Sequence, residues 1–245
     1  MTKPHLTNYD HQALPFSKLH EYSVHCGTDY LAVKDAPAML KEIQPLNKVL
    51  DLGCGSGLAT RFLKQHFPEA FVIGADINEK MLEQAIASDP QGLYLQFPER
   101  DNEILYPFLP STFDAIVSSF VVHENQTLDE LQAFFRNAQN LLRPGGLFLA
   151  WDVYKNLFAG SWVSIENNSA ANAHIEEGQP YSVKLAPSGA CVSGTYWSPE
   201  TLLKVANSVG LMTQSLSYPL AEQSNDINWK DETQLSPYFV IALKK

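Results

Sequence analysis

The feature that most constrains the fold of this chain is a short apolar segment that runs into three closely spaced glycines. Residues 49–57 read Val-Leu-Asp-Leu-Gly-Cys-Gly-Ser-Gly. The apolar run predicts a buried parallel strand, and the helical spacing of apolar residues after Gly57 predicts a helix. Glycine accepts positive φ and lacks a Cβ, so the turn backbone can lie against a ligand while its N–H groups point at it. The segment therefore predicts a strand, a ligand-binding turn and a helix, in that order.

The spacing of the glycines separates two classes of ligand. A dinucleotide fingerprint requires Gly-x-Gly-x-x-Gly, but here the third glycine is Gly57 and the sixth position is Leu58. Asp51, beside the turn, would repel a pyrophosphate and attract a cation. A Gly-x-Gly segment by itself is also compatible with an ordinary tight turn. With the acid included, the segment predicts a ligand that carries an ammonium or sulfonium group.

On these residues the chain resembles the class I S-adenosylmethionine-dependent methyltransferases. The first motif of that family has two hydrophobic residues, an acid, a hydrophobic residue and Gly-x-Gly-x-Gly, and residues 49–57 match it without a gap. The resemblance implies that S-adenosylmethionine is the cofactor. It also implies that this segment supplies five cofactor-binding residues, which are Asp51, Gly53, Cys54, Gly55 and Gly57.

A second acid follows at the interval that the resemblance requires. The predicted strand Ala70–Ala75 ends in Asp76, 76 − 57 = 19 residues after the last glycine, and a helix is expected over Asn78–Ser88. In the resembled family this acid binds both ribose hydroxyls, and such charge-assisted hydrogen bonds contribute roughly 1.5–3 kcal/mol each. Capping of the helix is a compatible role. Ile77 is expected on the adenine face, with ordinary core packing as the alternative.

The next part of the chain departs from the family pattern. A third strand is expected at Leu93–Phe97, after which Asp101 or Asn102 is the nearest match to the acid that binds the adenine amino group. A solvated loop is the alternative for this stretch. The fourth strand is expected at Phe113–Val117, and Ser119 just after it is a further candidate cofactor contact.

The second specific signature is the segment Leu141–Leu149, which predicts a helix end, a Pro-Gly-Gly turn and a fifth strand. Residues 47–152 alternate strand and helix five times, which predicts a doubly wound parallel sheet with ligands at the carboxyl ends of its strands. The resemblance extends this to a Rossmann-like α/β fold with seven strands. Its last two strands are expected near Leu211–Tyr218 and Tyr238–Leu243, with the final strand antiparallel.

We expect an N-terminal helical cover at residues 1–46 and a cofactor-binding domain at residues 47–245, with a lid insertion at about residues 153–197. The length and the 45% apolar content suffice for one sizeable core. The further expected elements are helices around Gln12–Tyr22 and Tyr30–Ile43, the latter interrupted near Pro37, a hairpin of Tyr181–Leu185 with Cys191–Trp197, and a helix from Pro199.

The whole layout is similar to small-molecule methyltransferases of the ubiquinone-biosynthesis and toxoflavin-synthase-like type. Tyr9 is then expected near the methionine end of the cofactor, with a solvated or packed tyrosine as the alternative. Aromatic side chains of the lid are expected to wall a pocket for a planar or apolar substrate, although each ring also fits ordinary packing. These side chains are Tyr154, Phe158, Trp162, Tyr181, Tyr196 and Trp197.

Methyl transfer requires alignment of an N, O, S or C nucleophile with the methyl group in a site that excludes water. If the nucleophile is a hydroxyl, His123 is the first candidate base, with a packing or capping role as the alternative, and Glu124, Asp152 and His174 rank behind it. The stretch after the fourth strand contains neither the Asn/Asp-Pro-Pro-Tyr/Phe clamp of adenine and amide methylation nor an aspartate for Mg²⁺. We therefore expect a metal-independent enzyme.

Composition restricts the partners. The net charge is 17 − 27 = −10 and no basic run exceeds two residues, which disfavours nucleic acid. No apolar run approaches the roughly 18 residues of a membrane span, and three cysteines form no metal-binding or disulfide pattern. We expect a cytoplasmic monomer or homodimer that methylates a small molecule. A nicotinamide-dependent oxidoreductase and a non-catalytic binding module of the same fold are the alternatives.

Overall fold

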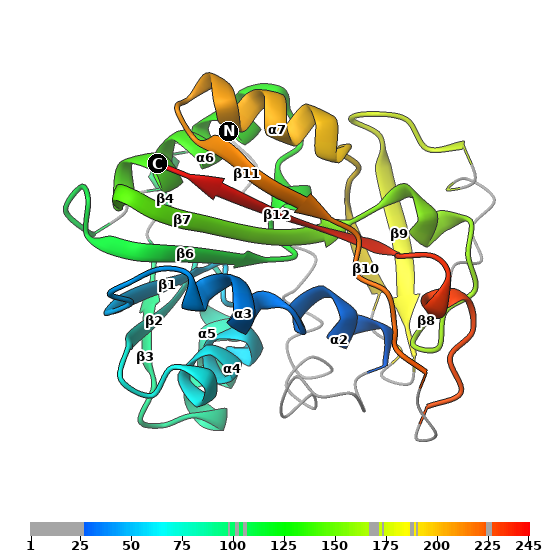
Figure 1. Ribbon diagram of the computed structural model, residues 1–245, viewed down its shortest axis with the longest axis horizontal. Coiled ribbons are helices and arrows are strands. Elements are labelled where there is room, and N and C mark those ends of the chain that lie inside the picture. The colour runs from blue at the N-terminus through cyan, green and yellow to red at the C-terminus, as the bar shows by residue number, and fades with distance from the viewer. Residues whose placement is uncertain are drawn as a thin grey trace.

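The computed structural model describes most of the chain after its first 26 residues. The described residues are 27–97, 99–100, 103–104, 107–166, 172, 174–186, 189, 191–223 and 227–245. The predictions for Tyr9, residues 12–22, Asp101 and Asn102 therefore lie outside them. Within them, helices flank a seven-stranded sheet, and a three-stranded sheet lies beside its end, on the right in Figure 1.

The central sheet has the strand order β11-β12-β7-β6-β1-β2-β3. Its neighbours pair in parallel except β12, which is antiparallel to both β7 and β11. This arrangement confirms the predicted Rossmann-like sheet with an antiparallel last strand. The strands are β1 (Lys48–Leu52), β2 (Phe71–Asp76), β3 (Leu93–Gln96), β6 (Phe113–Ser119), β7 (Leu142–Val153), β11 (Met212–Ser217) and β12 (Tyr238–Lys244).

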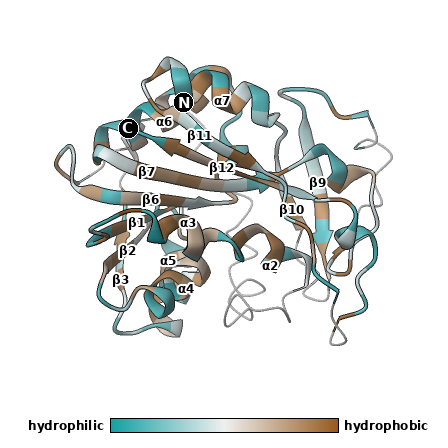
Figure 2. Ribbon diagram, in the orientation of Figure 1, coloured by the Kyte–Doolittle hydropathy of each residue, from teal (hydrophilic) through white to brown (hydrophobic). Residues whose placement is uncertain are grey.

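Both faces of the sheet are buried, because alternate residues of each strand enter separate hydrophobic clusters. Val49 and Val117 lie in one cluster, and Leu50 and Ile116 in the other. Hydrophobic residues accordingly concentrate along β6, β7 and β12 (Figure 2). None of the helices in the described part of the chain has the length and apolarity needed to cross a bilayer. The helices are α2 (Thr28–Val33), α3 (Ala36–Lys41), α4 (Leu58–His66), α5 (Glu79–Ser88), α6 (Leu128–Leu141) and α7 (Pro199–Ser208).

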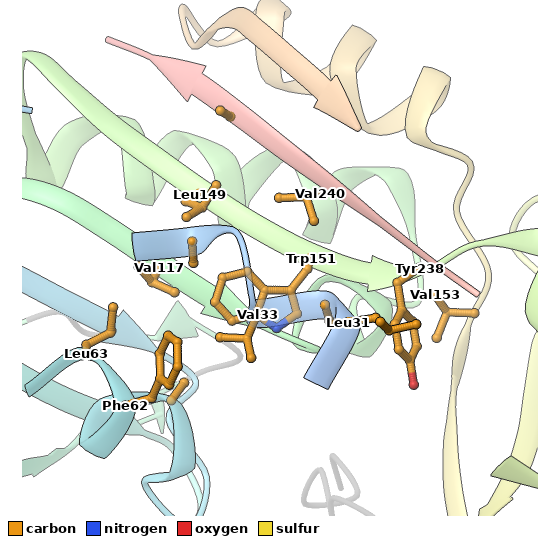
Figure 3. Close-up of a cluster of buried hydrophobic side chains, with 14 of the residues drawn as sticks. Leu31, Val33, Phe62, Leu63, Val117, Leu149, Trp151, Val153, Tyr238 and Val240 are labelled. Atoms are coloured by element: carbon orange, nitrogen blue, oxygen red, sulfur yellow. The ribbon is translucent and has the colours of Figure 1, made fainter. Parts of the chain in front are cut away.

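The short helices α2 and α3 pack against the sheet through the first cluster. Leu31 and Val33 of α2 lie beside the fully buried ring of Trp151 on β7 (Figure 3). The predicted break in this helical region is present, but it falls at Lys34–Asp35. Pro37 lies in the first turn of α3, where its missing N–H leaves no hydrogen bond unmade.

The prediction of a separate Pro-Gly-Gly turn is wrong, because β7 starts at Leu142 and includes all three of these residues. The pairing of β6 with β7 shifts register between Phe113 and Ala115, so the glycines form an irregular start of the strand rather than a separate turn. A Cβ on Gly146 would lie 2.9 Å from the carbonyl oxygen of Arg143 and 3.0 Å from that of Asp114. Glycine is required there for close approach of two backbones.

The segment predicted to be a lid contains a three-stranded antiparallel sheet in the order β10-β9-β8. The predicted hairpin is confirmed as β9 (Pro180–Leu185) and β10 (Cys191–Thr195), and β8 (Ile165–Glu166) is an addition that the sequence pattern did not predict. The buried carboxylate of Glu232 joins this region to the N-terminal side. Its Oε1 accepts hydrogen bonds from Thr28 Oγ1 at 2.7 Å and from the Val163 N–H at 2.6 Å.

Short elements occupy the remaining described connections. They are the two-stranded pair β4 (Glu99–Arg100) and β5 (Glu103–Ile104) and the 3₁₀ turns η3 (Val122–Glu124), η4 (Lys155–Phe158) and η6 (Asp231–Thr233). The turn η3 follows β6 at its carboxyl end. It therefore lies at the edge of the sheet where ligands of doubly wound folds bind.

Asp114 provides a test of how the start of β1 is held. Its Oδ2 accepts hydrogen bonds from the N–H groups of Asn47 and Lys48, both at 2.8 Å, and Oδ1 accepts from Arg143. Burial opposes ionisation, but the hydrogen bonds from Arg143 and the two backbone groups hold the pKa of Asp114 below its ordinary value. Its stabilising effect is therefore present above the unfolded pKa and is lost as the pH falls.

We expect Asp114→Ala to lower the free energy of unfolding by about 2–4 kcal/mol at pH 7, because two backbone donors and a guanidinium lose their acceptor. Urea unfolding at pH 7 and pH 3 measures this, and the difference from wild type should shrink at pH 3. Asp129→Asn, on the exposed start of α6, is the control. A difference that stays constant with pH would contradict the assignment.

Candidate functional site at the carboxyl edge of the sheet

The turn between β1 and α4 adopts the conformation that its glycines predict. Gly53, Gly55 and Gly57 have φ values of 78°, 52° and 78°. A Cβ on Gly53 would lie 2.4 Å from Cγ2 of Val121, so this position also requires the absence of a side chain. The N–H groups of Gly53 and Cys54 donate to the Ala75 carbonyl oxygen at 2.8 and 3.0 Å. The turn is thus fixed to the end of β2.

Asp76, at the end of β2, is hydrogen-bonded to the same turn. Its Oδ2 accepts from the Gly55 N–H at 2.7 Å, and its Oδ1 accepts from the Asn78 N–H at 2.8 Å. Asn78, not Asp76, caps the N-terminus of α5, because its Oδ1 accepts a hydrogen bond from the Met81 N–H at 3.0 Å. Burial raises the pKa of Asp76, and the negative charge of Glu124 adds to the effect.

Asp51 lies beneath the turn and is fully buried. Its Oδ2 accepts a hydrogen bond from Thr60 Oγ1 of α4, whereas no described residue provides a partner for its Oδ1. Burial raises the pKa of Asp51 to about 7; the Thr60 hydrogen bond opposes this rise and the charge of Asp76 supports it. A buried carboxylate oxygen without a donor is costly, so this position favours a cationic ligand nearby.

Three other predicted cofactor residues have less distinctive surroundings. Cys54 is buried, and burial followed by the charges of Asp76 and Asp51 raises the pKa of its thiol. Ile77 is half-buried and packs against the second hydrophobic cluster. Ser119 Oγ accepts a hydrogen bond from Trp151 Nε1 at 2.9 Å, which ties the end of β6 to β7.

His123 lies in η3 and is held by two carboxylates. Its Nδ1 is 2.8 Å from Asp152 Oδ1, its backbone N–H donates to Asp152 Oδ2 at 3.1 Å, and its Nε2 is 3.3 Å from Glu124 Oε1. Burial acts against the charged imidazolium, but the charges and hydrogen bonds of Asp152 and Glu124 prevail and raise the pKa of His123 to about 10. The side chain is therefore protonated at neutral pH. That state disfavours the predicted role as a general base, which stays a prediction.

The aromatic residues of the predicted lid pocket divide into separate groups. Tyr181 lies 5.9 Å from the His123 ring and 5.2 Å from the Phe158 ring, and Phe158 lies 5.9 Å from Tyr196, all with tilted or edge-on geometry. Trp162 is fully buried in the same hydrophobic cluster, and its Nε1 donates to the Leu157 carbonyl oxygen at 2.8 Å.

The other two residues predicted to line the pocket, Trp197 and Tyr154, contact different parts of the chain. Trp197 Nε1 donates to the Asn125 carbonyl oxygen at 2.8 Å, and Tyr154 packs against Tyr218 at 4.6 Å between ring centroids. A cavity of about 10 Å³ lies among these elements, close to the 10–15 Å³ that one water molecule requires. Its lining includes His123, Asp152, Tyr181, Thr195, Tyr196 and Trp197.

Sequence reasoning missed two residues that shape this site. A Cβ on Gly194 of β10 would lie 2.4 Å from Cδ2 of His123, so the lid backbone rests directly on the imidazole ring. An isolated glycine inside a strand indicates such an approach. Asp152, ranked behind His123 as a base, is the principal partner of that histidine. His174 is exposed, and among the described residues no group of three or more His, Cys, Asp or Glu side chains is arranged to hold a metal ion.

Comparison with known proteins finds similarity over the part of the chain that contains the glycine turn. Residues 49–146 match a family model described as methyltransferase domain. An uncharacterized methyltransferase from Synechocystis is 37% identical over 113 residues, which cover 46% of this chain and 50% of that protein. A malonyl-[acyl-carrier protein] O-methyltransferase from Hahella chejuensis is 35% identical over 98 residues, or 40% and 33% of the two chains. An 18S rRNA (guanine(1575)-N(7))-methyltransferase from Saccharomyces cerevisiae is 29% identical over 151 residues, or 57% and 53%.

Solved structures extend the likeness to most of the chain. An S-adenosylmethionine-dependent methyltransferase from Mesorhizobium loti superposes with a TM-score of 0.61, covering 91% of this chain and 100% of that one at 18% identity. The chain spans about half or less of the length of the curated relatives that it matches. Residues 49–146 match a methyltransferase domain, and the described part of the chain has the same fold as the solved S-adenosylmethionine-dependent methyltransferase from Mesorhizobium loti. S-adenosylmethionine is the cofactor that this domain and fold indicate.

The pKa of Asp51 leads to a prediction for the pH dependence of cofactor binding. A carboxyl that ionises near pH 7 attracts the cationic cofactor more strongly as the pH rises toward 7. We expect the affinity for S-adenosylmethionine to rise about tenfold between pH 5.5 and pH 7, with proton release at the lower pH. Isothermal titration calorimetry in buffers of different ionisation enthalpy measures both quantities.

Asp51→Asn should bind more weakly and lose most of this pH dependence, whereas Asp129→Asn should behave like wild type. The same slope in Asp51→Asn and in wild type would show that another group titrates.

Proposed function

We propose that the protein transfers a methyl group from S-adenosylmethionine to an N, O or C nucleophile of a small-molecule acceptor by in-line displacement, without a metal ion. The observation that carries this proposal is the hydrogen bond between Asp76 and the glycine turn, which brings a carboxylate and the turn together at the carboxyl edge of the sheet. The methyltransferase domain match over residues 49–146 supports it.

Each part of this edge has a role in the proposal. The turn Gly53–Gly57 and the cationic preference of Asp51 would receive the methionine part of the cofactor, and Asp76 would bind the ribose. Ile77 would contact the adenine, with Asp101 or Asn102, outside the described residues, as its polar partner. Ser119 and Tyr9, the latter also outside the described residues, remain proposed cofactor contacts.

The acceptor is proposed to enter between this edge and the lid of residues 153–197. Such a lid excludes water and aligns the nucleophile, and methyl transfer requires little more from the protein. Tyr181, Tyr196 and Trp197 stay the proposed acceptor contacts, and the cavity that they line beside His123 has room for about one water molecule. Trp162 is buried away from that cavity, which favours a packing role for it.

A small molecule fits better than nucleic acid as the acceptor. The chain carries 27 acidic against 17 basic residues. Nucleic-acid affinity depends largely on contacts between basic residues and phosphates, and a net charge of −10 opposes them. The names of the relatives include both acyl-carrier-protein and rRNA acceptors, so they do not decide between the two classes.

We expect Gly55→Val and Asp76→Ala each to weaken S-adenosylmethionine binding at least tenfold in calorimetry. A valine at φ 52° is strained, and its Cβ would lie 3.0 Å from Met81 Cε; Asp76→Ala removes charge-assisted hydrogen bonds. Gly210→Val is the matched control, since Gly210 has a φ of 91° and lies away from the turn.

The alternatives have separate signatures in the same experiments. Unchanged cofactor affinity in both site variants would refute the proposal. Tight binding of NADH in a fluorescence titration would favour the oxidoreductase. Failure to bind S-adenosylmethionine, together with a stable complex with another protein, would favour the non-catalytic module.

A further inference from the structure

The backbone just after β6 has an unusual conformation. Phe120, the residue that follows this strand, has a φ of 55°, which bulky side chains seldom adopt and which is often found at functional sites. Its N–H donates to the Trp151 carbonyl oxygen at 3.1 Å, so hydrogen bonding to β7 continues up to this residue. The next residue, Val121, lies against Gly53 of the glycine turn. Phe120 therefore adjoins the turn that is proposed to receive the methyl donor.

The Phe120 side chain connects this turn to a hydrogen-bonded pair on its other side. Its ring packs edge-on against the Tyr238 ring, with 5.0 Å between the centroids. Tyr238 begins β12 and lies opposite Val153, the last residue of β7, so it too lies at the carboxyl edge of the sheet. Its ring extends toward α2 (Figure 3), and its hydroxyl donates a hydrogen bond to Asp29 Oδ1 at 2.7 Å. The Asp29 carboxylate is therefore held beside the same edge.

Asp29 has the properties of a proton acceptor. The residue is only partly buried, and its Oδ2 has no hydrogen-bond partner among the described residues. One oxygen is thus held while the other is open. Burial raises the pKa of Asp29 to about 6, and the hydrogen bond from Tyr238 opposes the rise. The side chain is therefore ionised at neutral pH and is a stronger base than an ordinary aspartate.

Three other ionisable groups at this edge are already occupied. The two ring nitrogens of His123 face Asp152 at 2.8 Å and Glu124 at 3.3 Å, and the ring is protonated at neutral pH. Both oxygens of Asp152 take part in hydrogen bonds with His123. Both oxygens of Asp76 accept hydrogen bonds from backbone N–H groups. Asp29 therefore meets the requirement for a base better than these three groups.

A base at this position matters for some acceptors and not for others. A carboxylate is already an anion at neutral pH, whereas a hydroxyl must lose its proton as the new bond forms. A phenol ionises at about pH 10, so among hydroxyls it gives up its proton readily. The Phe120 ring, which packs on the partner of Asp29, also suits an aromatic acceptor, because aromatic rings favour offset and edge-on contacts with one another.

We propose that Asp29 accepts the proton of the acceptor's nucleophile, and that this nucleophile is the hydroxyl of a phenol. Tyr238 and Phe120 are positioning residues, because they act through the Asp29 carboxylate. This inference rests on the proposed methyl transfer and names its substrate class. The role of base then belongs to Asp29 rather than to His123.

The corresponding reaction balances without a further reactant. The hydroxyl oxygen forms a bond to the methyl carbon with a lone pair, and its proton passes to Oδ2 of Asp29. The electron pair of the breaking sulfur–methyl bond stays on sulfur. The products are a methyl ether, neutral S-adenosylhomocysteine and a protonated Asp29, which returns its proton to solvent.

Two acceptor probes of the same shape separate proton acceptance from general damage to the site. Phenol keeps its proton at pH 8, whereas benzenethiol is largely ionised at that pH and needs no base. We expect Asp29→Asn in the full chain to lower methyl transfer to phenol at least a hundredfold and transfer to benzenethiol less than threefold, with S-adenosylmethionine affinity changed less than twofold. Asp35→Asn is the matched control, since it removes an exposed carboxylate just after α2, and it should change none of these quantities.

The positioning role of Tyr238 is tested by pH dependence. In wild type, transfer to phenol should rise with pH through about 6 and then level off, and carbon-13 NMR of the Asp29 carboxyl group should give the same midpoint. Tyr238→Phe should move both midpoints to higher pH, because it removes a hydrogen bond that favours the carboxylate. A merely structural defect would lower the rate without moving either midpoint.

Three results would overturn the inference: equal losses with both probes in Asp29→Asn, unchanged midpoints in Tyr238→Phe, or transfer by wild type to benzenethiol but not to phenol. A wild-type chain that binds no S-adenosylmethionine, or that binds it and methylates neither probe, would instead count against the proposed function itself.

Discussion

The attachment of the glycine turn to the end of β2 is the constraint on which the rest of the site depends. The register of the parallel pair sets it, because Leu52 lies opposite Ala75, whose carbonyl oxygen then accepts hydrogen bonds from the N–H groups of Gly53 and Cys54. The same register places Gly74 opposite Asp51. A Cβ on Gly74 would lie 2.8 Å from Thr60 Oγ1, so the hydrogen bond from Thr60 to Asp51 requires a glycine there. One strand pair therefore positions both Asp51 and Asp76.

A second junction joins the lid to this framework. The His123 side chain pairs with Asp152 of β7 and with Glu124 of its own turn. The Tyr181 ring of β9 and the Gly194 backbone of β10 pack against its imidazole ring. A buried ion pair is seldom a large net source of stability, but the loss of one partner leaves an uncompensated charge. Its value here lies in geometry, since the charged ring admits few arrangements of the lid strands above it. Residues of η3, β7, β9 and β10 accordingly line the cavity beside the ring.

The sequence was most informative where chemistry and local conformation coincide. Three glycines with positive φ and an acid 19 residues later predicted the turn and its partner on β2, because few other residue types adopt that backbone. It was least informative where partners are distant along the chain. Nothing local to His123 reveals that Asp152, 29 residues later, holds it, or that Gly194 covers it. The Pro-Gly-Gly segment was assigned to a turn because its role, close approach to the β6 backbone, depends on tertiary pairing.

The excess of negative charge along the carboxyl edge has a consequence for stability as well as for binding. Like charges repel, and at this edge the charge of Asp76 raises the pKa of Asp51 while that of Glu124 raises the pKa of Asp76. Folding alone would favour a neutral residue at Asp51, which is fully buried and has one carboxylate oxygen without a hydrogen-bond donor among the described residues. Its presence is understandable if a cationic ligand occupies the edge when the protein works, because a bound cation relieves repulsion that the empty fold must carry. On this argument a bound cationic methyl donor stabilises the edge. Asp76 is central to it, because the charge of Asp76 raises the pKa of Asp51 and the charge of Glu124 raises the pKa of Asp76.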